Sequence, residues 1–132
     1  MREFIARFVA FTLLGNTDAH LKNWALVYPD GQSPVLSPLY DPVCVTAFFE
    51  TVKPADYAVN RAIDKTLRAL SWTDLEALLR TAQLSRVPDH LRRARELVKQ
   101  AKADWPKLLV DAPPAVRRAV TERLAGGVAL AA

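Results

Sequence analysis

Four prolines lie close together in the first third of the chain, at positions 29, 34, 38 and 42. Proline has no main-chain N–H and its ring clashes with the preceding helical turn, so this section cannot form a regular helix. It contains the strand-like run Trp24–Tyr28 and the turn sequence Pro29-Asp30-Gly31-Gln32, in which glycine permits a positive φ. With a second strand around residues 34–39, the segment predicts one small β-hairpin.

The residues before this segment follow helical spacing instead. Residues 3–14 carry apolar side chains on two faces of a helix, which predicts a helix that is buried on most sides and ends at Gly15. These apolar residues are Phe4, Ile5, Phe8, Val9, Phe11 and Leu13.

The second half of the chain predicts four more helices. One covers residues 57–70, and the next starts at the capping box Ser71-Trp72-Thr73-Asp74 and turns inward Leu75, Leu78, Leu79 and Ala82. A third starts near Pro88, is kinked or ended by Pro106, and carries the apolar stripe Leu91, Ala94, Leu97, Val98, Ala101 and Trp105. The last runs from Pro113-Pro114 to just before Gly126-Gly127. We therefore expect a mainly α fold with one small β-hairpin near the N-terminus, in which residues 1–132 form one domain.

Composition narrows the class of protein. The 132 residues are 51% hydrophobic and 24% charged, which is enough apolar content for folding. The single cysteine, Cys44, excludes an intrachain disulfide and indicates a reducing compartment, so we expect a small buried side chain there. Because no signal-peptide cleavage site precedes Gly15 and no apolar run is long enough to span a membrane, we expect a cytoplasmic protein that does not contact a membrane.

The formal net charge is +4, and the positive excess lies in the second half of the chain. Its basic residues alternate with Asp89 and Glu96, which favours a solvated helix face over a nucleic-acid surface. We therefore expect no direct binding of nucleic acid, and we expect His90 to lie at the surface. Phe48-Phe49 and Trp72 fit either a partner surface or core packing, and core packing is favoured. The basic residues are Arg80, Arg86, Arg92, Arg93, Arg95, Lys99 and Lys102.

The densest group of polar residues lies between the first helix and the first strand. It consists of Asn16, Thr17, Asp18, His20, Lys22 and Asn23. In protein kinases a loop aspartate accepts the proton of the substrate hydroxyl, and an asparagine five residues later binds magnesium. Asp18 and Asn23 have that spacing, although both residue types are also common in turns and helix caps. Without a second histidine or cysteine at ligand spacing, His20 fits a brace for the loop better than a metal ligand.

A kinase needs a second acidic magnesium ligand after the hairpin that follows this loop. Asp41 stands there, directly after Leu39-Tyr40. The need is physical, because the triphosphate is negatively charged and magnesium prefers oxygen ligands such as an amide and a carboxylate. Lys22 would add a positive charge toward the transferring phosphoryl group.

Two motifs resemble the catalytic loop and the metal-binding segment of HipA-like serine/threonine kinases, the toxin half of a bacterial toxin–antitoxin system: Gly15-Asn16-Thr17-Asp18-Ala19-His20-Leu21-Lys22-Asn23 and Leu36-Ser37-Pro38-Leu39-Tyr40-Asp41. The resemblance covers about residues 1–100, except that residues 60–64 replace a glycine-containing turn usual in the family. It implies a kinase C-lobe that uses ATP and Mg²⁺, with Asp18 as catalytic base, Lys22 beside it, Asn23 and Asp41 as metal ligands, and Asn16 and His20 shaping the loop. It also implies protein substrates such as an aminoacyl-tRNA synthetase, and a DNA-binding antitoxin as partner.

The sequence departs from a complete kinase at its start. A kinase needs a glycine-rich loop over the phosphates and a strand lysine, both upstream of the catalytic loop, whereas Lys22 is the first lysine here. We therefore expect an incomplete kinase whose nucleotide-binding lobe comes from elsewhere, such as a separate chain. Two alternatives remain open: a non-catalytic, decayed lobe that acts as a binding module, and a fragment of a small-molecule kinase related to aminoglycoside or choline kinases.

Overall fold

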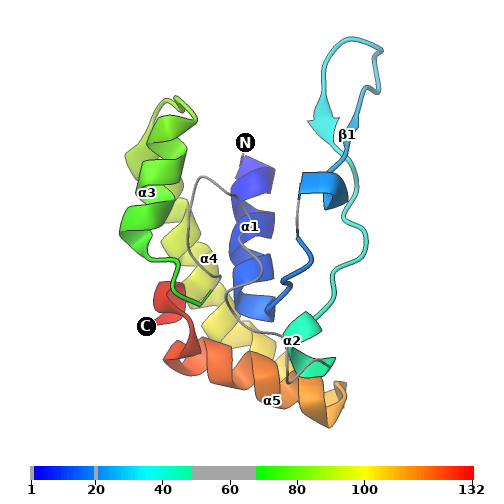
Figure 1. Cartoon of the computed structure of the whole chain (residues 1–132), viewed down its shortest axis with the longest axis vertical. Coiled ribbons are helices and arrows are strands. Elements are labelled where there is room, and N and C mark those ends of the chain that lie inside the picture. The colour runs from blue at the N-terminus through cyan, green and yellow to red at the C-terminus, as the bar shows by residue number, and fades with distance from the viewer. Residues whose placement is uncertain (1, 20, 49–67) are drawn as a thin grey trace.

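Helix α1 (Arg2–Leu14) packs against the long helix α4 (Val87–Leu108), and this pair forms the centre of the fold (Figure 1). The computed structural model describes residues 2–19, 21–48 and 68–132. As predicted, α1 is buried on several sides, through Ile5, Phe8, Val9, Phe11, Thr12 and Leu13. A helix this apolar is covered by protein on most of its surface.

The predicted hairpin is present, and it projects away from the helices (Figure 1). Strand β1 (Leu26–Val27) pairs antiparallel with β2 (Val35–Leu36), with Leu26 opposite Leu36. Both strands are shorter than expected, because the prolines that flank β2 have no N–H to donate to a longer ladder. At the tip, the Asp30 carboxylate accepts hydrogen bonds from the main-chain N–H groups of Gln32 at 2.9 Å and Ser33 at 2.6 Å.

Helix α3 (Trp72–Thr81) begins with the predicted capping box. The Ser71 hydroxyl accepts from the Asp74 N–H at 3.2 Å, and the Asp74 carboxylate accepts from the Ser71 N–H at 2.8 Å. Leu75 and Leu79 are buried and Leu78 is partly buried, as expected. Ala82 was expected to turn inward but is exposed, because the helix ends at Thr81 and Gln83 adopts a positive φ of 54°.

Helix α4 carries the predicted buried stripe along its inner face. Pro88 lies in its first turn, where a missing N–H costs nothing, and Leu91, Ala94, Val98 and Ala101 are buried. Pro106 does not end the helix at once: α4 continues for one more half-turn to Leu108, and the 3-10 turn η3 (Leu109–Asp111) follows.

The C-terminal part starts and stops where the prolines and glycines predict. Helix α5 (Pro114–Glu122) leads into a π-helical turn, η4 (Arg123–Gly127), and a final 3-10 turn, η5 (Ala129–Ala131). Helix α5 packs against the short helix α2 (Val45–Phe48), which follows the hairpin. The C-terminal part thereby contacts the short helix that follows Asp41 in the sequence.

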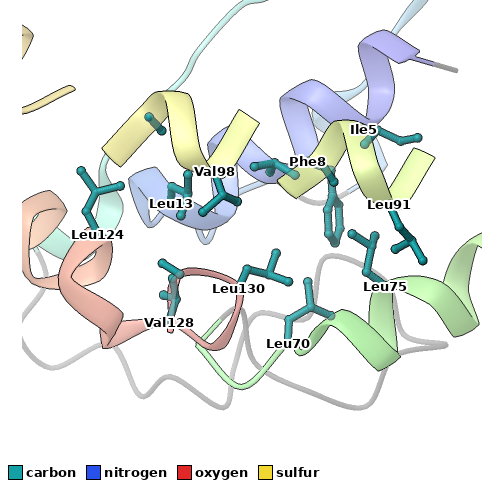
Figure 2. Packing of buried hydrophobic residues seen from close by; sticks show 14 of the residues in the cluster. Ile5, Phe8, Leu13, Leu70, Leu75, Leu91, Val98, Leu124, Val128 and Leu130 are labelled. Atoms are coloured by element: carbon teal, nitrogen blue, oxygen red, sulfur yellow. The ribbon is translucent and has the colours of Figure 1, made fainter. Parts of the chain in front are cut away.

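The hydrophobic core draws on α1, α3, α4 and the C-terminal turns (Figure 2). Phe8 of α1, Leu75 of α3 and Leu130 of η5 are each 1% exposed. Cys44 belongs to this cluster at 5% exposure, as expected for a small apolar side chain. None of the helices in the described residues is both long and apolar enough to cross a membrane.

Two aromatic predictions have different outcomes. Trp72 is partly buried against the core, and the Arg95 guanidinium lies 4.8 Å from its ring centre. Phe48 is 60% exposed, so the preference for core packing was wrong there, and Phe49 lies outside the described residues. The helix predicted over residues 57–70 also falls largely outside them, and its described end, at Arg68 and Ala69, forms a turn.

Four basic residues in α3 and around the start of α4 pair with acidic residues nearby in the sequence. Arg80 pairs with Glu76, Arg93 with Glu96, and Asp89 with both Arg86 and Arg92. This confirms the predicted interleaving of charges, which leaves a mixed, solvated face.

Candidate functional site

The loop that joins α1 to β1 starts at Gly15. The N–H groups of Gly15 and Asn16 both donate to the Phe11 carbonyl at 3.0 Å, which closes the last turn of α1. Gly15 has a φ of +76°, and a Cβ at this position would overlap the Thr46 hydroxyl. Only glycine therefore fits where the helix turns into the loop.

Asn16 and Asp18 form the first part of the loop. Asn16 is 3% exposed, and its Oδ1 accepts a hydrogen bond from the Asp18 N–H at 3.1 Å. The main chain is also held by the Thr17 N–H, which donates to the Gly15 carbonyl at 3.1 Å. Asn16 thus holds the main chain of the loop from its buried side, while Asp18 lies at the surface.

Asn23 closes the loop onto Asp18. It ends the 3-10 turn η1 (Leu21–Asn23), and its Nδ2 donates to the Asp18 carbonyl at 2.6 Å and to the Asp18 carboxylate at 3.1 Å. The structure therefore brings together the two residues whose spacing pointed to a kinase loop. With the Asn23 nitrogen engaged, its Oδ1 is the atom with acceptor capacity for a cation.

Trp24 anchors the end of the loop to α1. Its ring centre lies 4.8 Å from that of Phe4 and 5.4 Å from that of Phe11, and its Nε1 donates to the Ala19 carbonyl at 3.2 Å. Arg7, further along α1, donates to the Ser37 carbonyl at 2.7 Å, next to β2. Sequence reasoning assigned neither residue a role at the site. The aromatic face of α1 was the signal that an aromatic partner would follow.

Asp41 lies after β2, at the open end of the hairpin where Asn23 precedes β1. The pairing continues one step past the strands toward this end, because the Ser37 N–H donates to the Ala25 carbonyl at 2.9 Å. Asp41 is exposed and has a φ of +50°, a left-handed conformation that aspartate tolerates better than most residues.

The remaining loop residues have different environments. Lys22 is exposed in η1, and His20 lies outside the described residues. The Thr17 hydroxyl is buried and has no hydrogen-bond partner among the described residues. An unsatisfied buried hydroxyl costs roughly 1–3 kcal/mol, and such groups concentrate at functional sites.

The donor set at the open end of the hairpin suits magnesium. An amide oxygen at Asn23 and a carboxylate at Asp41 are hard ligands, and magnesium is usually bound by one or two carboxylates together with substrate phosphates. In the described ranges no three or more histidine, cysteine, aspartate or glutamate residues gather into a protein-only metal cage. By ligand type, Asn23 and Asp41 suit a cation that also binds a phosphate.

Comparison with known proteins identifies the family of the chain. Residues 1–105 match the family described as the HipA-like C-terminal domain, a stretch that contains the loop, the hairpin and Asp41. The chain belongs to this family. The HipA-like match ends within α4, so α5 and the turns after it lie beyond the matched residues.

Two bacterial relatives of this HipA-like domain are named as kinases. "Putative kinase Y4dM" of Sinorhizobium fredii is 41% identical over 121 residues, which cover 90% of this chain and 28% of the relative. "Putative kinase" of Haemophilus influenzae is 43% identical over 49 residues, which cover 37% of this chain and 14% of the relative. The chain thus spans less than a third of the length of either relative. No solved structure matches it.

Proposed function

We propose that this chain is the catalytic-loop lobe of a kinase that transfers the γ-phosphoryl group of ATP to a serine or threonine hydroxyl of a protein. The observation that carries the proposal is the contact between Asn23 and Asp18 on a loop held at both ends. Membership of the HipA-like family and the names of the two relatives support it.

Asp18 is the proposed base. Its main chain is fixed by Asn16 and Asn23, and its side chain is exposed, as contact with a substrate hydroxyl requires. In the transfer, the hydroxyl oxygen forms a bond to the γ-phosphorus, the bond from that phosphorus to the bridging oxygen of ADP breaks, and the hydroxyl proton passes to the Asp18 carboxylate. Lys22 is exposed on the same loop, and its proposed role is to add a positive charge toward the negative phosphoryl group.

Asn23 and Asp41 are the proposed magnesium ligands. When bound, the ion neutralises charge on the phosphates of ATP. Asn23 then has two proposed roles. Its nitrogen orients Asp18 through a hydrogen bond, and its oxygen would bind the cation. Asn16 positions the loop from its buried side, and His20 is the second proposed loop-shaping residue.

The wider setting is also proposed. A nucleotide-binding lobe would be supplied by another part of a longer protein or by a separate chain, which agrees with the far greater length of both relatives. By family resemblance, the substrate is a protein such as an aminoacyl-tRNA synthetase, the partner is a DNA-binding antitoxin, and the kinase acts as a toxin in the cytoplasm.

A second candidate is a binding module without catalytic activity. Most of the large exposed apolar residues in the described part of the chain belong to the hairpin and the segment after it: Leu26, Val27, Tyr28, Val35, Leu39, Tyr40, Val43 and Phe48. Clustered apolar exposure of this kind marks contact surfaces. It is compatible with a lobe interface in a kinase and with partner binding alone, so activity decides between the two candidates.

A chimera tests the proposal. The chain replaces its matching segment in the S. fredii relative, and transfer of labelled phosphate from ATP to protein is compared for the chimera, Asp18→Asn and the control Asp104→Asn on the exposed face of α4. We expect Asp18→Asn to lower the rate about 10²–10⁴-fold and Asp104→Asn to leave it unchanged. Equal rates for Asp18→Asn and the unmutated chimera would refute Asp18 as the base. A chimera that binds ATP without any transfer would favour the binding module.

A further inference from the structure

Arg123 is a buried charged side chain far along the chain from the loop. It begins the turn η4 and is 3% exposed. Its Nε and Nη2 both donate to the main-chain carbonyl of Thr12, at 3.1 Å and 2.6 Å. Two N–H groups of the guanidinium therefore donate to one carbonyl oxygen of α1.

That carbonyl lacks its usual helical partner. In a regular helix the Thr12 oxygen would accept from the Asn16 N–H, but here the Asn16 N–H donates to the Phe11 carbonyl. The carboxyl end of α1 is thus left with an unsatisfied acceptor, which Arg123 fills. A positive charge at this end of a helix is also favoured by the helix dipole.

The same side chain packs against the first residue of the loop. A Cβ at Gly15 would lie 3.2 Å from both the Cδ and the Nε of Arg123, so the guanidinium stem rests on the glycine. The Gly15 carbonyl accepts from the Thr17 N–H and from the Thr46 N–H of α2. Arg123 therefore lies where α1, α2 and the loop meet. The residue that it contacts there, Gly15, is three positions before Asp18 in the sequence.

Burial of this charge has an energetic cost. Burial, together with the nearby positive charge of Arg68, lowers the pKa of Arg123 to about 10, so the side chain stays charged at neutral pH. A desolvated charge lowers the stability of the fold. Its hydrogen bonds offset that cost only when their geometry is well defined. An apolar side chain of similar length would fill the space without fixing the Thr12 carbonyl.

We propose that Arg123 is a positioning residue of the candidate site: it holds the carboxyl end of α1 and so sets where the loop that carries Asp18 and Asn23 begins. The assignment of that loop as a catalytic loop rests on the proposed function, whereas the contact between Arg123 and the Thr12 carbonyl does not. With Arg123, the candidate site extends past residue 105, where the family match ends, into the C-terminal turns.

Three variants of the full chain test the inference. Arg123→Met removes the donors and keeps the length, Arg123→Lys keeps the charge and one donor group, and Arg118→Met is a control at an exposed position of α5. The readouts are amide hydrogen exchange and chemical shifts of residues 15–18, thermal stability, and phosphoryl transfer by the S. fredii chimera that carries each variant. Glycine amides are easy to assign, because the chain has only four glycines.

We expect Arg123→Met to speed exchange of the Gly15 and Asn16 amides about tenfold or more relative to amides in α3, because a hydrogen bond from a charged group is lost. We expect partial recovery in Arg123→Lys and no change in Arg118→Met. A uniform loss of stability without a change specific to residues 15–18 would overturn the inference. If Arg123→Met does not fold, wild-type-like loop shifts and exchange in folded Arg123→Lys would overturn it as well.

The two proposals fail separately in this experiment. Loop changes in Arg123→Met, with no phosphoryl transfer by the unmutated S. fredii chimera, would keep the positioning role and count against the kinase assignment. Phosphoryl transfer by the chimera that Arg123→Met retains in full, with unchanged loop shifts in the chain, would keep the kinase assignment and remove Arg123 from the site.

Discussion

The side-chain nitrogen of Asn23 lies 2.6 Å from the main-chain oxygen of Asp18 and 3.1 Å from its carboxylate. One amide group therefore fixes both the main chain and the side chain of the proposed base. The contact is compatible with separate proposed roles: the Asp18 carboxylate would accept the proton of a substrate hydroxyl, and the Asn23 oxygen would bind a cation.

Asn23→Ala should disturb two properties at once. It removes both hydrogen bonds to Asp18 and the proposed metal ligand, so we expect weaker Mg²⁺-dependent ATP binding and altered amide shifts at Asp18. Asp18→Asn should leave ATP binding largely intact. Isothermal titration of the S. fredii chimera with Mg²⁺ and ATP, combined with amide spectra of the chain by itself, distinguishes the two variants. Identical binding by Asn23→Ala and the unmutated protein would remove Asn23 from the metal site.

In the S. fredii chimera, Asp41→Asn should lower the affinity for Mg²⁺ with ATP by about tenfold or more, because loss of a ligand costs at least as much as loss of a residue that orients one. The melting temperature should stay nearly unchanged, since Asp41 is exposed and asparagine tolerates its φ of +50° equally well. Asp111→Asn, an exposed change in η3, is the matched control. A large fall in melting temperature in Asp41→Asn would instead assign this residue a structural role.

Ser71→Ala should destabilise the fold by about 1 kcal/mol, because it removes the hydroxyl that caps the Asp74 N–H at the start of α3. Chemical denaturation measures the change in the free energy of unfolding. Ser85→Ala, at an exposed position before α4, removes a hydroxyl without a cap and should have little effect. Equal losses in both variants would contradict the capping role.

The hairpin tip should respond to acid. Hydrogen bonds from the main chain of Ser33 and Gln32 lower the pKa of Asp30 from 3.8 to about 2. Since the folded pKa lies below the unfolded one, the stabilising effect of the carboxylate is complete above about pH 4 and is lost as the pH falls toward 2. Carboxyl carbon shifts followed by NMR should show this low midpoint, and the Ser33 amide should report the same transition. A midpoint near 3.8 would mean that the turn does not hold the carboxylate.

Local patterns predicted those parts of the fold that depend on neighbouring residues. The capping box at Ser71 and the proline in the first turn of α4 act within one helical turn, and both are present. Apolar spacing alone predicts that Ala82 turns inward, because it does not show that the helix stops at Thr81, one residue before. The strands were overestimated, since an apolar run cannot reveal how far its ladder extends.

The candidate site was only partly visible in the sequence. The spacing of Asp18 and Asn23 reflects a turn that brings them together locally, so a motif captures it. The contacts of Trp24 with α1 and of Arg123 with Thr12 join separate elements, and a single arginine in a basic helical region gives no sign of burial. Tertiary contacts of this kind require the packing of the whole chain.

The contact between Arg123 and Thr12 spans 111 positions of sequence. A ribosome adds about 5–20 residues per second, so the carbonyl at the end of α1 is made several seconds before the guanidinium that binds it. Local turns can form early around Asp18, but the contact that holds the start of the loop cannot form until Arg123 has been synthesised. Translation order therefore delays completion of the proposed kinase site until its last structural element has emerged.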